Sequence, residues 1–169
     1  MINGYAWVFG DNVNTDLMAP ARLLKRPVAE YAAHCMETLQ PQFASQVKPG
    51  DIVVGGINFG CGSSREQAPD SLKYLGVAAV IAKRFARTFY RNAMNIGLPA
   101  IVCKEADLIR QGHELRICIE NGIIENVDSG IAYPCEAIPA HLLAMLNDGG
   151  LLGSLEKHLR AKDANGRRR

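Results

Sequence analysis

The chain has 169 residues, which is enough for one domain of ordinary size and too few for two full ones. Apolar residues make up 48% and charged residues 21%, values that exclude a disordered or collagen-like chain. No apolar run approaches the roughly 20 residues of a membrane-spanning helix, and the first residues lack the basic and apolar regions of a secretory signal. We therefore expect a cytoplasmic protein without a membrane contact.

The charge is distributed unevenly along the chain. Lysine and arginine total 19 against 17 acidic residues, a net charge of +2, but residues 156–169 alone hold six basic and two acidic side chains. The rest of the chain holds 13 basic and 15 acidic residues. Because a nucleic-acid-binding domain carries a basic face, this acidic body argues against a nucleic-acid partner. We predict one domain over residues 1–155 and a basic tail over residues 156–169.

The first half of the chain alternates predicted strands with predicted helices. In chain order it contains a strand at 4–9, a turn-rich segment at 10–22, a helix at 27–39, a strand at 51–56 and a helix at 65–75. A glycine-rich loop joins the last two elements. Pro69 falls in the second turn of the last helix and predicts a kink, and Gly76 ends that helix.

The second half continues the alternation, with apolar runs typical of buried strands. Its predicted elements are a strand at 77–82, helices at 84–97 and 105–111, a strand at 98–103, strands at 114–119 and 122–127, and a helix at 136–147. Asn121 and Gly122 predict a hairpin turn between the last two strands. This order of strands and helices indicates an α/β or α+β domain.

The number and spacing of the cysteines indicate neither a disulfide framework nor a zinc site. Their number is odd, their spacing is wide, no C-x-x-C occurs, and no histidine lies at a zinc-like spacing from them. We expect most of them to be small buried thiols in a reducing compartment, with Cys61 set apart by its neighbours. The five are Cys35, Cys61, Cys103, Cys118 and Cys135.

The most informative segment is the loop 58–66, with the sequence NFGCGSSRE. Gly60 and Gly62 allow a ligand to approach the backbone closely. The helix predicted to begin near Arg65 points its first N–H groups and the positive end of its dipole at the loop. Because Arg65 adds a two-pronged donor for an anion, the segment predicts a carboxylate or phosphate site.

A structural alternative exists for the same loop. Ser63-Ser64-Arg65-Glu66 matches the S-x-x-E pattern of a capping box, in which Ser63 and Glu66 close the start of a helix. The two interpretations are compatible in part, because the capping box needs neither Ser64 nor Arg65.

Cations gather where the helix at 84–97 is predicted to begin. Lys83, Arg84 and Arg87 lie next to a helix N-terminus, where positive charge is unfavourable. This placement indicates that they face an anion or a partner surface.

Three segments together resemble a known family. They are NTD at 14–16, NFGCGSSREQAP at 58–69 and VIAKRFARTFYRNAMNIGLP at 80–99. Their order and spacing resemble the small subunits of the aconitase superfamily, including those of 3-isopropylmalate dehydratase and homoaconitase, and the swivelling domain of aconitase. The resemblance covers about residues 5–150. It implies an α/β fold with a single three-layer β/β/α swivelling domain.

The resemblance also implies the activity and the partners. Such a chain is a hydro-lyase subunit, active only with a large subunit in a heterodimer or heterotetramer, on a small 2-hydroxy diacid. The large subunit carries the [4Fe–4S] cluster, so this chain is expected to bind no cofactor or metal, and Cys61 is not a cluster ligand. For 3-isopropylmalate dehydratase the reaction is the reversible dehydration–hydration of 2-isopropylmalate and 3-isopropylmalate in leucine biosynthesis.

Roles for single residues follow from the same resemblance. Ser63 matches the serine whose alkoxide takes a proton from the carbon beside a carboxylate, and such a base needs donors and positive charge around it. The Ser64 N–H, Arg65 and the helix N-terminus behind Ser63 are expected to supply them. Arg65 and Ser64 are also expected to hold a substrate carboxylate. Thr15 and Asp16 match a pair at the edge of the site, where the aspartate polarises the groups that handle the leaving hydroxyl.

The substrate-sorting loop departs from the family pattern. It reads Leu23-Leu24-Lys25-Arg26, and we expect Leu24, Lys25 and Arg26 to contact the substrate. Inward cations favour a third carboxylate, as in homoaconitate, whereas inward leucines favour an alkylmalate such as isopropylmalate, citramalate or dimethylmalate. A different class of function, a non-catalytic module that binds a dicarboxylate, is disfavoured because a binder needs no base at Ser63.

Overall fold

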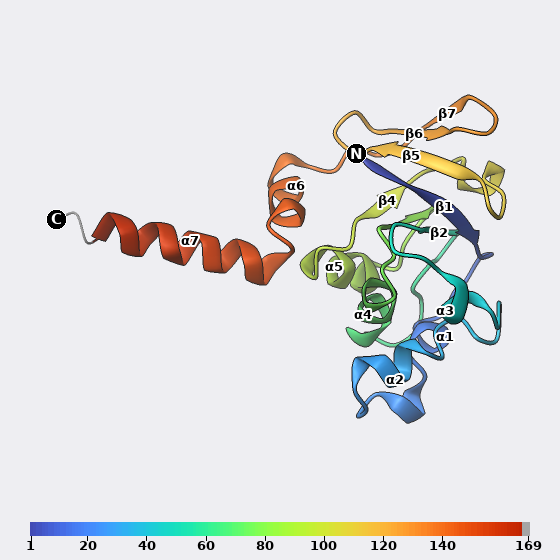
Figure 1. Cartoon of the computed structure of the whole chain (residues 1–169), viewed down its shortest axis with the longest axis horizontal. Helices are drawn as coiled ribbons and strands as arrows, with labels where there is room; N and C mark the ends of the chain where they lie inside the picture. The colour runs from blue at the N-terminus through green and yellow to red at the C-terminus, as the bar shows by residue number, and fades with distance from the viewer. Residues whose placement is uncertain (167–169) are drawn as a thin grey trace.

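The computed structural model of the chain describes residues 1–166, except for the side chains of residue 161 and residues 163–166 (Figure 1). Residues 167–169 of the predicted basic tail lie outside the described residues. A folded body of strands and helices occupies most of the chain, and a long C-terminal helix extends from it.

The body is built on one curled sheet of seven strands in the order β4-β3-β2-β1-β5-β6-β7. Four strands are parallel: β1 (Ile2–Val8), β2 (Ile52–Gly55), β3 (Ala79–Ala82) and β4 (Ala100–Val102). Three antiparallel strands follow: β5 (Glu114–Cys118), β6 (Ile123–Asn126) and β7 (Ile131–Pro134). β1 belongs to both halves, since its first residues pair with β5 and its last with β2.

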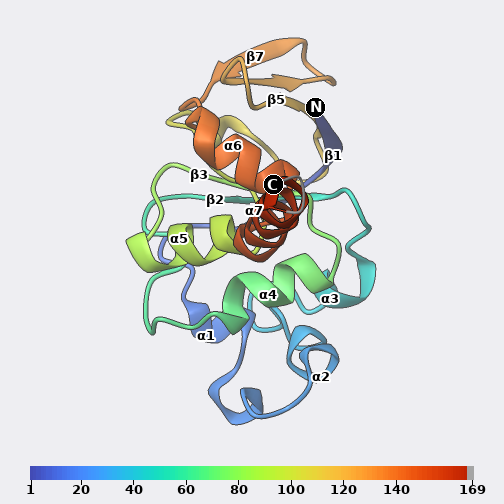
Figure 2. The ribbon, with the colours of Figure 1, turned by 90° about the vertical axis from the view of Figure 1, so that its left-hand side faces the viewer.

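The helices lie mainly on one side of the parallel strands. They are α1 (Thr15–Met18), η1 (Ala21–Leu23), α2 (Val28–Ala32), α3 (Phe43–Gln46), α4 (Gln67–Tyr74), α5 (Arg87–Asn95), η2 (Ala106–Leu108), α6 (Ala140–Asn147) and α7 (Leu151–Gly166). Figure 2 shows the antiparallel strands above, the parallel strands in the middle, and α5 and α4 below them. This arrangement confirms the expected α/β class with its β/β/α layers.

The parallel strands are the centre of the core. Every residue of β2 and β3 is buried, as expected for strands covered on both faces. Phe59, Phe85 and Phe89 pack against one another beside them, with ring centroids 5.3–6.0 Å apart. The aromatic group therefore fixes the loop after β2 against α5.

Several predicted boundaries are wrong by a few residues. The helix expected at 27–39 ends at Ala32 and gives way to turns, in which Met36 has a φ of +60°. The helix expected from residue 84 begins at Arg87, because Arg84 and Ala86 hydrogen-bond to the backbone of Phe59 instead. Pro69 is the third residue of α4 and not in its second turn. Its missing N–H is therefore not needed, and no kink is required.

The C-terminal part differs most from the prediction. The strand β7 was not expected, and α6 begins only after Pro139, which holds the N-cap position. α7 begins at Leu151 and runs through the predicted boundary between residues 155 and 156. The division into a domain and a tail at that point stays a prediction.

The burial of the cysteines differs in part from the expectation. All five cysteines are free; Cys35 and Cys103 are buried, whereas Cys61, Cys118 and Cys135 are partly exposed. Fewer thiols are therefore fully buried than expected.

Within residues 1–166, no helix combines the length and the apolar character that crossing a membrane requires.

Candidate active site

Three segments far apart in the sequence meet at the carboxyl ends of β1, β2 and β3. The loop after β2 forms a parallel bridge with each neighbour, through Cys61 with Asn14 and through Phe59 with Phe85. The Phe59 N–H donates to the Arg84 carbonyl at 3.0 Å, and the Ala86 N–H donates to the Phe59 carbonyl at 2.8 Å. This edge of an open parallel sheet is where ligands bind in α/β proteins.

The loop is held in place by the segment that follows β1. The Gly60 N–H donates to the Val13 carbonyl, and the Thr15 N–H donates to the Cys61 carbonyl, both at 2.8 Å. The Thr15 hydroxyl, which is buried, donates to the Ser63 carbonyl at 3.0 Å. Thr15 therefore fixes the backbone of the predicted catalytic serine. This geometry favours a positioning role for Thr15 over the substrate contact expected from the sequence.

Gly62 permits the close approach of these two segments. Its φ is +96°, and a Cβ there would lie 2.4 Å from the Asn14 Oδ1 atom. That same Oδ1 accepts a hydrogen bond from the Asp16 N–H at 2.9 Å and caps α1. A larger residue at position 62 would displace the cap, which in turn orients Asp16.

Arg65 links the loop to Asp16. Its Nη1 donates to the Asp16 carboxylate and, at 3.0 Å, to the Ala19 carbonyl. The Arg65 side chain is only 13% exposed, whereas that of Asp16 is 49% exposed. Among the described residues, the other two guanidinium nitrogens have no hydrogen-bond partner. Arg65 is thus anchored at one nitrogen and keeps donors for a planar carboxylate.

The capping-box interpretation of this loop is wrong. α4 begins at Gln67 with Glu66 at the N-cap, and no side chain caps it. Ser63 lies four residues before the helix, in a tight turn where the Arg65 N–H donates to the Ser63 carbonyl at 2.7 Å. The helix therefore begins two residues later than expected, and Ser63 and Ser64 both lie outside it.

The hydroxyls of Ser63 and Ser64 are free to meet a ligand. Both residues are exposed, and neither side chain makes a hydrogen bond to the part of the chain that the structure describes. Ser63, Arg65 and Asp16 are therefore brought together at one surface edge. Arg65 supplies a formal positive charge within this loop.

The substrate-sorting loop is not joined to these residues. Leu24 is half-buried between η1 and α2, and Lys25 and Arg26 are exposed. Arg26 makes an ion pair with Glu30 at 3.2 Å on the outer surface of α2. No hydrogen bond or ion pair within residues 1–166 connects these three residues to Ser63, Ser64 or Arg65.

The cations at the start of α5 border a second part of the same edge. Lys83 makes an ion pair with Asp107 at 3.0 Å, whereas Arg84 and Arg87 are exposed. They surround a hollow of about 440 Å³ together with Tyr90. Burial, and then the nearby Glu136 carboxylate, raise the pKa of the Tyr90 hydroxyl.

Sequence reasoning missed Asn14 as a site residue. The signal was present, because asparagine is a preferred N-cap and directly precedes Thr15 and Asp16. The carbonyl of Ala19 had no such signal, since only the fold brings it to Arg65.

Among the described residues, no group of three or more histidine, cysteine, aspartate or glutamate side chains is arranged to hold a metal ion.

Comparison with known proteins identifies the family. The family model for the aconitase C-terminal domain matches residues 16–106. The chain is 50% identical over 161 residues to a 3-isopropylmalate dehydratase small subunit of Nautilia profundicola, covering 95% of this chain and 97% of that relative. It is 51% identical over 154 residues to a methanogen homoaconitase small subunit of Methanothermobacter thermautotrophicus, covering 90% and 89%.

A solved structure agrees in fold over nearly the whole length. The crystal structure of 3-isopropylmalate dehydratase (LeuD) from Methanocaldococcus jannaschii is 41% identical, with a TM-score of 0.91. The match covers 97% of this chain and 98% of that one. The chain therefore belongs to the family of the aconitase C-terminal domain, together with these dehydratase and homoaconitase small subunits.

Proposed function

We propose that the chain is the small subunit of 3-isopropylmalate dehydratase. With a large iron–sulfur subunit it would interconvert 2-isopropylmalate and 3-isopropylmalate by dehydration and rehydration, a step of leucine biosynthesis. The observation that carries the proposal is the exposed Ser63 beside the anchored Arg65, on a loop pinned at the carboxyl edge of the sheet. The names of the relatives support the substrate and the large subunit.

In this proposal Ser63 is the base. Its alkoxide removes the proton from the carbon beside a carboxylate as the hydroxyl leaves the neighbouring carbon, and on rehydration the neighbouring carbon receives a proton and the first carbon the hydroxyl. Serine is a weak base unless its alkoxide is stabilised, and Arg65 and the Ser64 N–H supply that stabilisation. The free nitrogens of Arg65 hold the substrate carboxylate, while Asp16 orients Arg65 and polarises the groups that handle the hydroxyl. Thr15 acts by positioning the Ser63 backbone.

The large subunit completes the site. Ser63 stands on an exposed edge, so the substrate needs a second wall to be shielded from water. We propose that this wall belongs to the large subunit and that Arg84 and Arg87 face it. The [4Fe–4S] cluster proposed for that subunit would supply a Lewis-acidic iron for the substrate hydroxyl and carboxylate. No cluster-binding role falls on the cysteines of this chain.

Homoaconitase is the second candidate. The chain is as similar to a homoaconitase small subunit, at 51% identity, as to a dehydratase small subunit, at 50%. Lys25 and Arg26 on the sorting loop favour a substrate with a third carboxylate if they turn toward it. Overall identity therefore does not discriminate between the two substrates.

Turnover by the reconstituted enzyme tests the proposal. The chain is combined with a candidate large subunit from the same organism, after anaerobic cluster assembly, and the specificity constants for 3-isopropylmalate, citramalate and homoaconitate are measured. We expect activity only with both subunits, and the highest constant for 3-isopropylmalate. A preference for homoaconitate would assign the second candidate. A chain that binds diacids tightly but never supports turnover would be a non-catalytic module.

A further inference from the structure

Three arginines at the start of α5 form a charged surface that the described part of the chain does not neutralise. Arg84, Arg87 and Arg91 are exposed, and none of them makes an ion pair with another described residue. We call these three residues the α5 arginine surface. Lys83 lies beside them but is paired with Asp107 at 3.0 Å, so its charge is already compensated.

The basic charge of the body is concentrated in this segment. Residues 83–91 hold four basic and no acidic side chains, whereas the rest of residues 1–155 hold nine basic and 15 acidic ones. Arg87 and Arg91 are four residues apart on one face of α5, where like charges destabilise a helix, and the positive end of the helix dipole adds to the repulsion. An anionic partner would remove this unfavourable term.

One acidic side chain borders the same surface. Glu136 lines the hollow of about 440 Å³ together with Arg84 and Arg87, but no ion pair joins it to either arginine. Since Asp107 compensates Lys83, two unpaired arginines meet one carboxylate there. The hollow therefore keeps a net positive charge, and its cations remain available to a partner.

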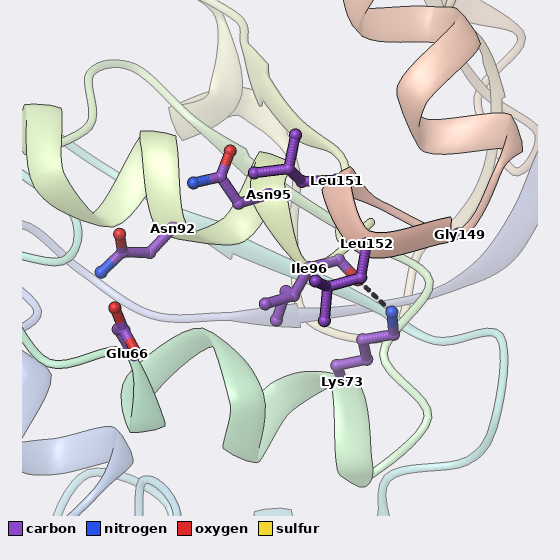
Figure 3. Close-up of a pocket in the computed structure, with 8 residues that line it drawn as sticks. All are labelled: Glu66, Lys73, Asn92, Asn95, Ile96, Gly149, Leu151 and Leu152. Atoms are coloured by element: carbon purple, nitrogen blue, oxygen red, sulfur yellow. Dashed lines mark hydrogen bonds between the residues drawn. The ribbon is translucent and has the colours of Figure 1, made fainter. Parts of the chain in front are cut away.

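The hollow beside the other end of α5 shows no such excess. It has a volume of about 380 Å³ and lies between α4, α5 and the start of α7 (Figure 3). Its charged lining residues are Glu66 and Lys73, one of each sign, and Asn92 and Asn95 add neutral amides. The unbalanced positive charge thus belongs to the end of α5 that lies at the carboxyl edge of the sheet.

The α5 arginine surface is continuous with the candidate active site. The Arg84 carbonyl accepts a hydrogen bond from the Phe59 N–H at 3.0 Å, and Phe85 forms a parallel bridge with Phe59. Ser63 lies four residues farther along the loop that contains Phe59. A protein that covers Ser63 from this edge would therefore also meet the arginines.

We infer that the α5 arginine surface docks onto an acidic surface of the large subunit. This inference rests on the proposed function and adds the chemistry of the partner's matching surface. Carboxylates of that surface would neutralise Arg84 and Arg87 and bring the second wall of the site over Ser63. Arginine suits this role because its planar guanidinium binds a carboxylate through two hydrogen bonds. Opposite charges on two surfaces also accelerate their encounter, by about 10- to 1,000-fold at low salt.

The test is the rate of association with the cluster-loaded large subunit, measured between about 50 and 500 mM salt. The wild-type rate constant should fall at least about tenfold over this range. At low salt, Arg84→Glu and Arg87→Glu should each lower it about tenfold, and the double variant about 100-fold with a weaker salt dependence. Lys48→Glu is the matched control, because Lys48 is an exposed cation before β2, at the opposite edge of the parallel strands, and should stay within about twofold of wild type.

Two further measurements separate charge from folding. Arg87→Lys keeps the positive charge and should retain most of the association rate. Arg87→Glu replaces a cation with an anion in the first turn of α5, so the thermal midpoint of the isolated chain should not fall. Slower association without a loss of thermal stability is a combination that a merely structural role of Arg87 would not produce.

The outcomes distinguish this inference from the proposed function. If the wild-type complex is active but the double variant associates as fast as wild type, the docking surface is wrong and the function stands. If the double variant associates normally but has a raised KM, the arginines contact the substrate, and the inference is overturned. If the wild-type chain associates with salt-sensitive kinetics but the complex turns over no diacid, the proposed function fails while the docking surface stands.

Discussion

Two loops of the proposed site are held in opposite ways. The loop 58–66 is fixed on both sides by backbone hydrogen bonds, and the buried Thr15 hydroxyl holds the Ser63 carbonyl. The loop 23–26, between η1 and α2, is exposed at Lys25 and Arg26, and its ion pair with Glu30 lies at the surface. Under the proposed function, the chemistry would depend on a preorganised loop, whereas substrate choice would depend on a loop with few constraints.

The largest effect is expected for Ser63→Ala in the reconstituted enzyme. Because the alkoxide acts in the transition state, kcat should fall by about 100- to 10,000-fold with little change in substrate binding. Since Ser63 caps no helix, the thermal midpoint of the isolated chain should stay the same. Steady-state kinetics and thermal unfolding are measured on the same preparations. A variant that is destabilised but active would refute the role of base.

Substrate choice should respond to the loop 23–26. Lys25→Val and Arg26→Val, singly and together, should raise the ratio of the specificity constant for 3-isopropylmalate to that for homoaconitate. A buried carboxylate that loses its cation is disfavoured by about 2–5 kcal/mol, whereas a branched alkyl group is not. Leu24→Ala should act in the opposite direction if Leu24 contacts that group. Ratios within about twofold of wild type would mean that the two cations point into solvent.

An intermediate effect is expected at Thr15. Thr15→Val removes the hydroxyl that donates to the Ser63 carbonyl and leaves that oxygen with only the Arg65 N–H, which should destabilise the chain by about 0.5–1.5 kcal/mol and also lower kcat. Thr15→Ser keeps the hydroxyl and should restore kcat. Urea unfolding and turnover are the measurements. Equal losses of kcat in the valine and serine variants would mean that packing of the Thr15 side chain, and not its hydrogen bond to Ser63, maintains kcat.

The smallest effect is expected for Glu30→Ala. This change removes the exposed ion pair with Arg26, and such pairs contribute about 0–1 kcal/mol. The free energy of unfolding should therefore change by less than about 1 kcal/mol, and turnover on 3-isopropylmalate should persist. A larger loss of stability would mean that the loop 23–26 is held as firmly as the loop 58–66, and the contrast between the two loops would not hold.

The sequence alone was informative wherever a local pattern decides the structure. Continuous apolar runs predicted the strands β3 and β4, because a strand covered on both faces needs apolar residues on both. Gly76 and Gly97 correctly predicted the ends of α4 and α5. The motif NFGCGSSRE directed attention to Ser63 and Arg65, and the structure brings Arg65 and Asp16 together, as expected of a shared site.

Only the tertiary structure decided the features that depend on distant partners. α5 begins three residues later than predicted because Arg84 and Ala86 bond to Phe59, which is about 25 residues earlier in the chain. The capping box did not form, since the backbone around Ser63 is held by Thr15. The direction of α7 follows from the packing of Gly150 against Asn95. Hydrogen-bond partners and close approaches of this kind leave no periodic trace in the sequence, so local patterns could not predict them.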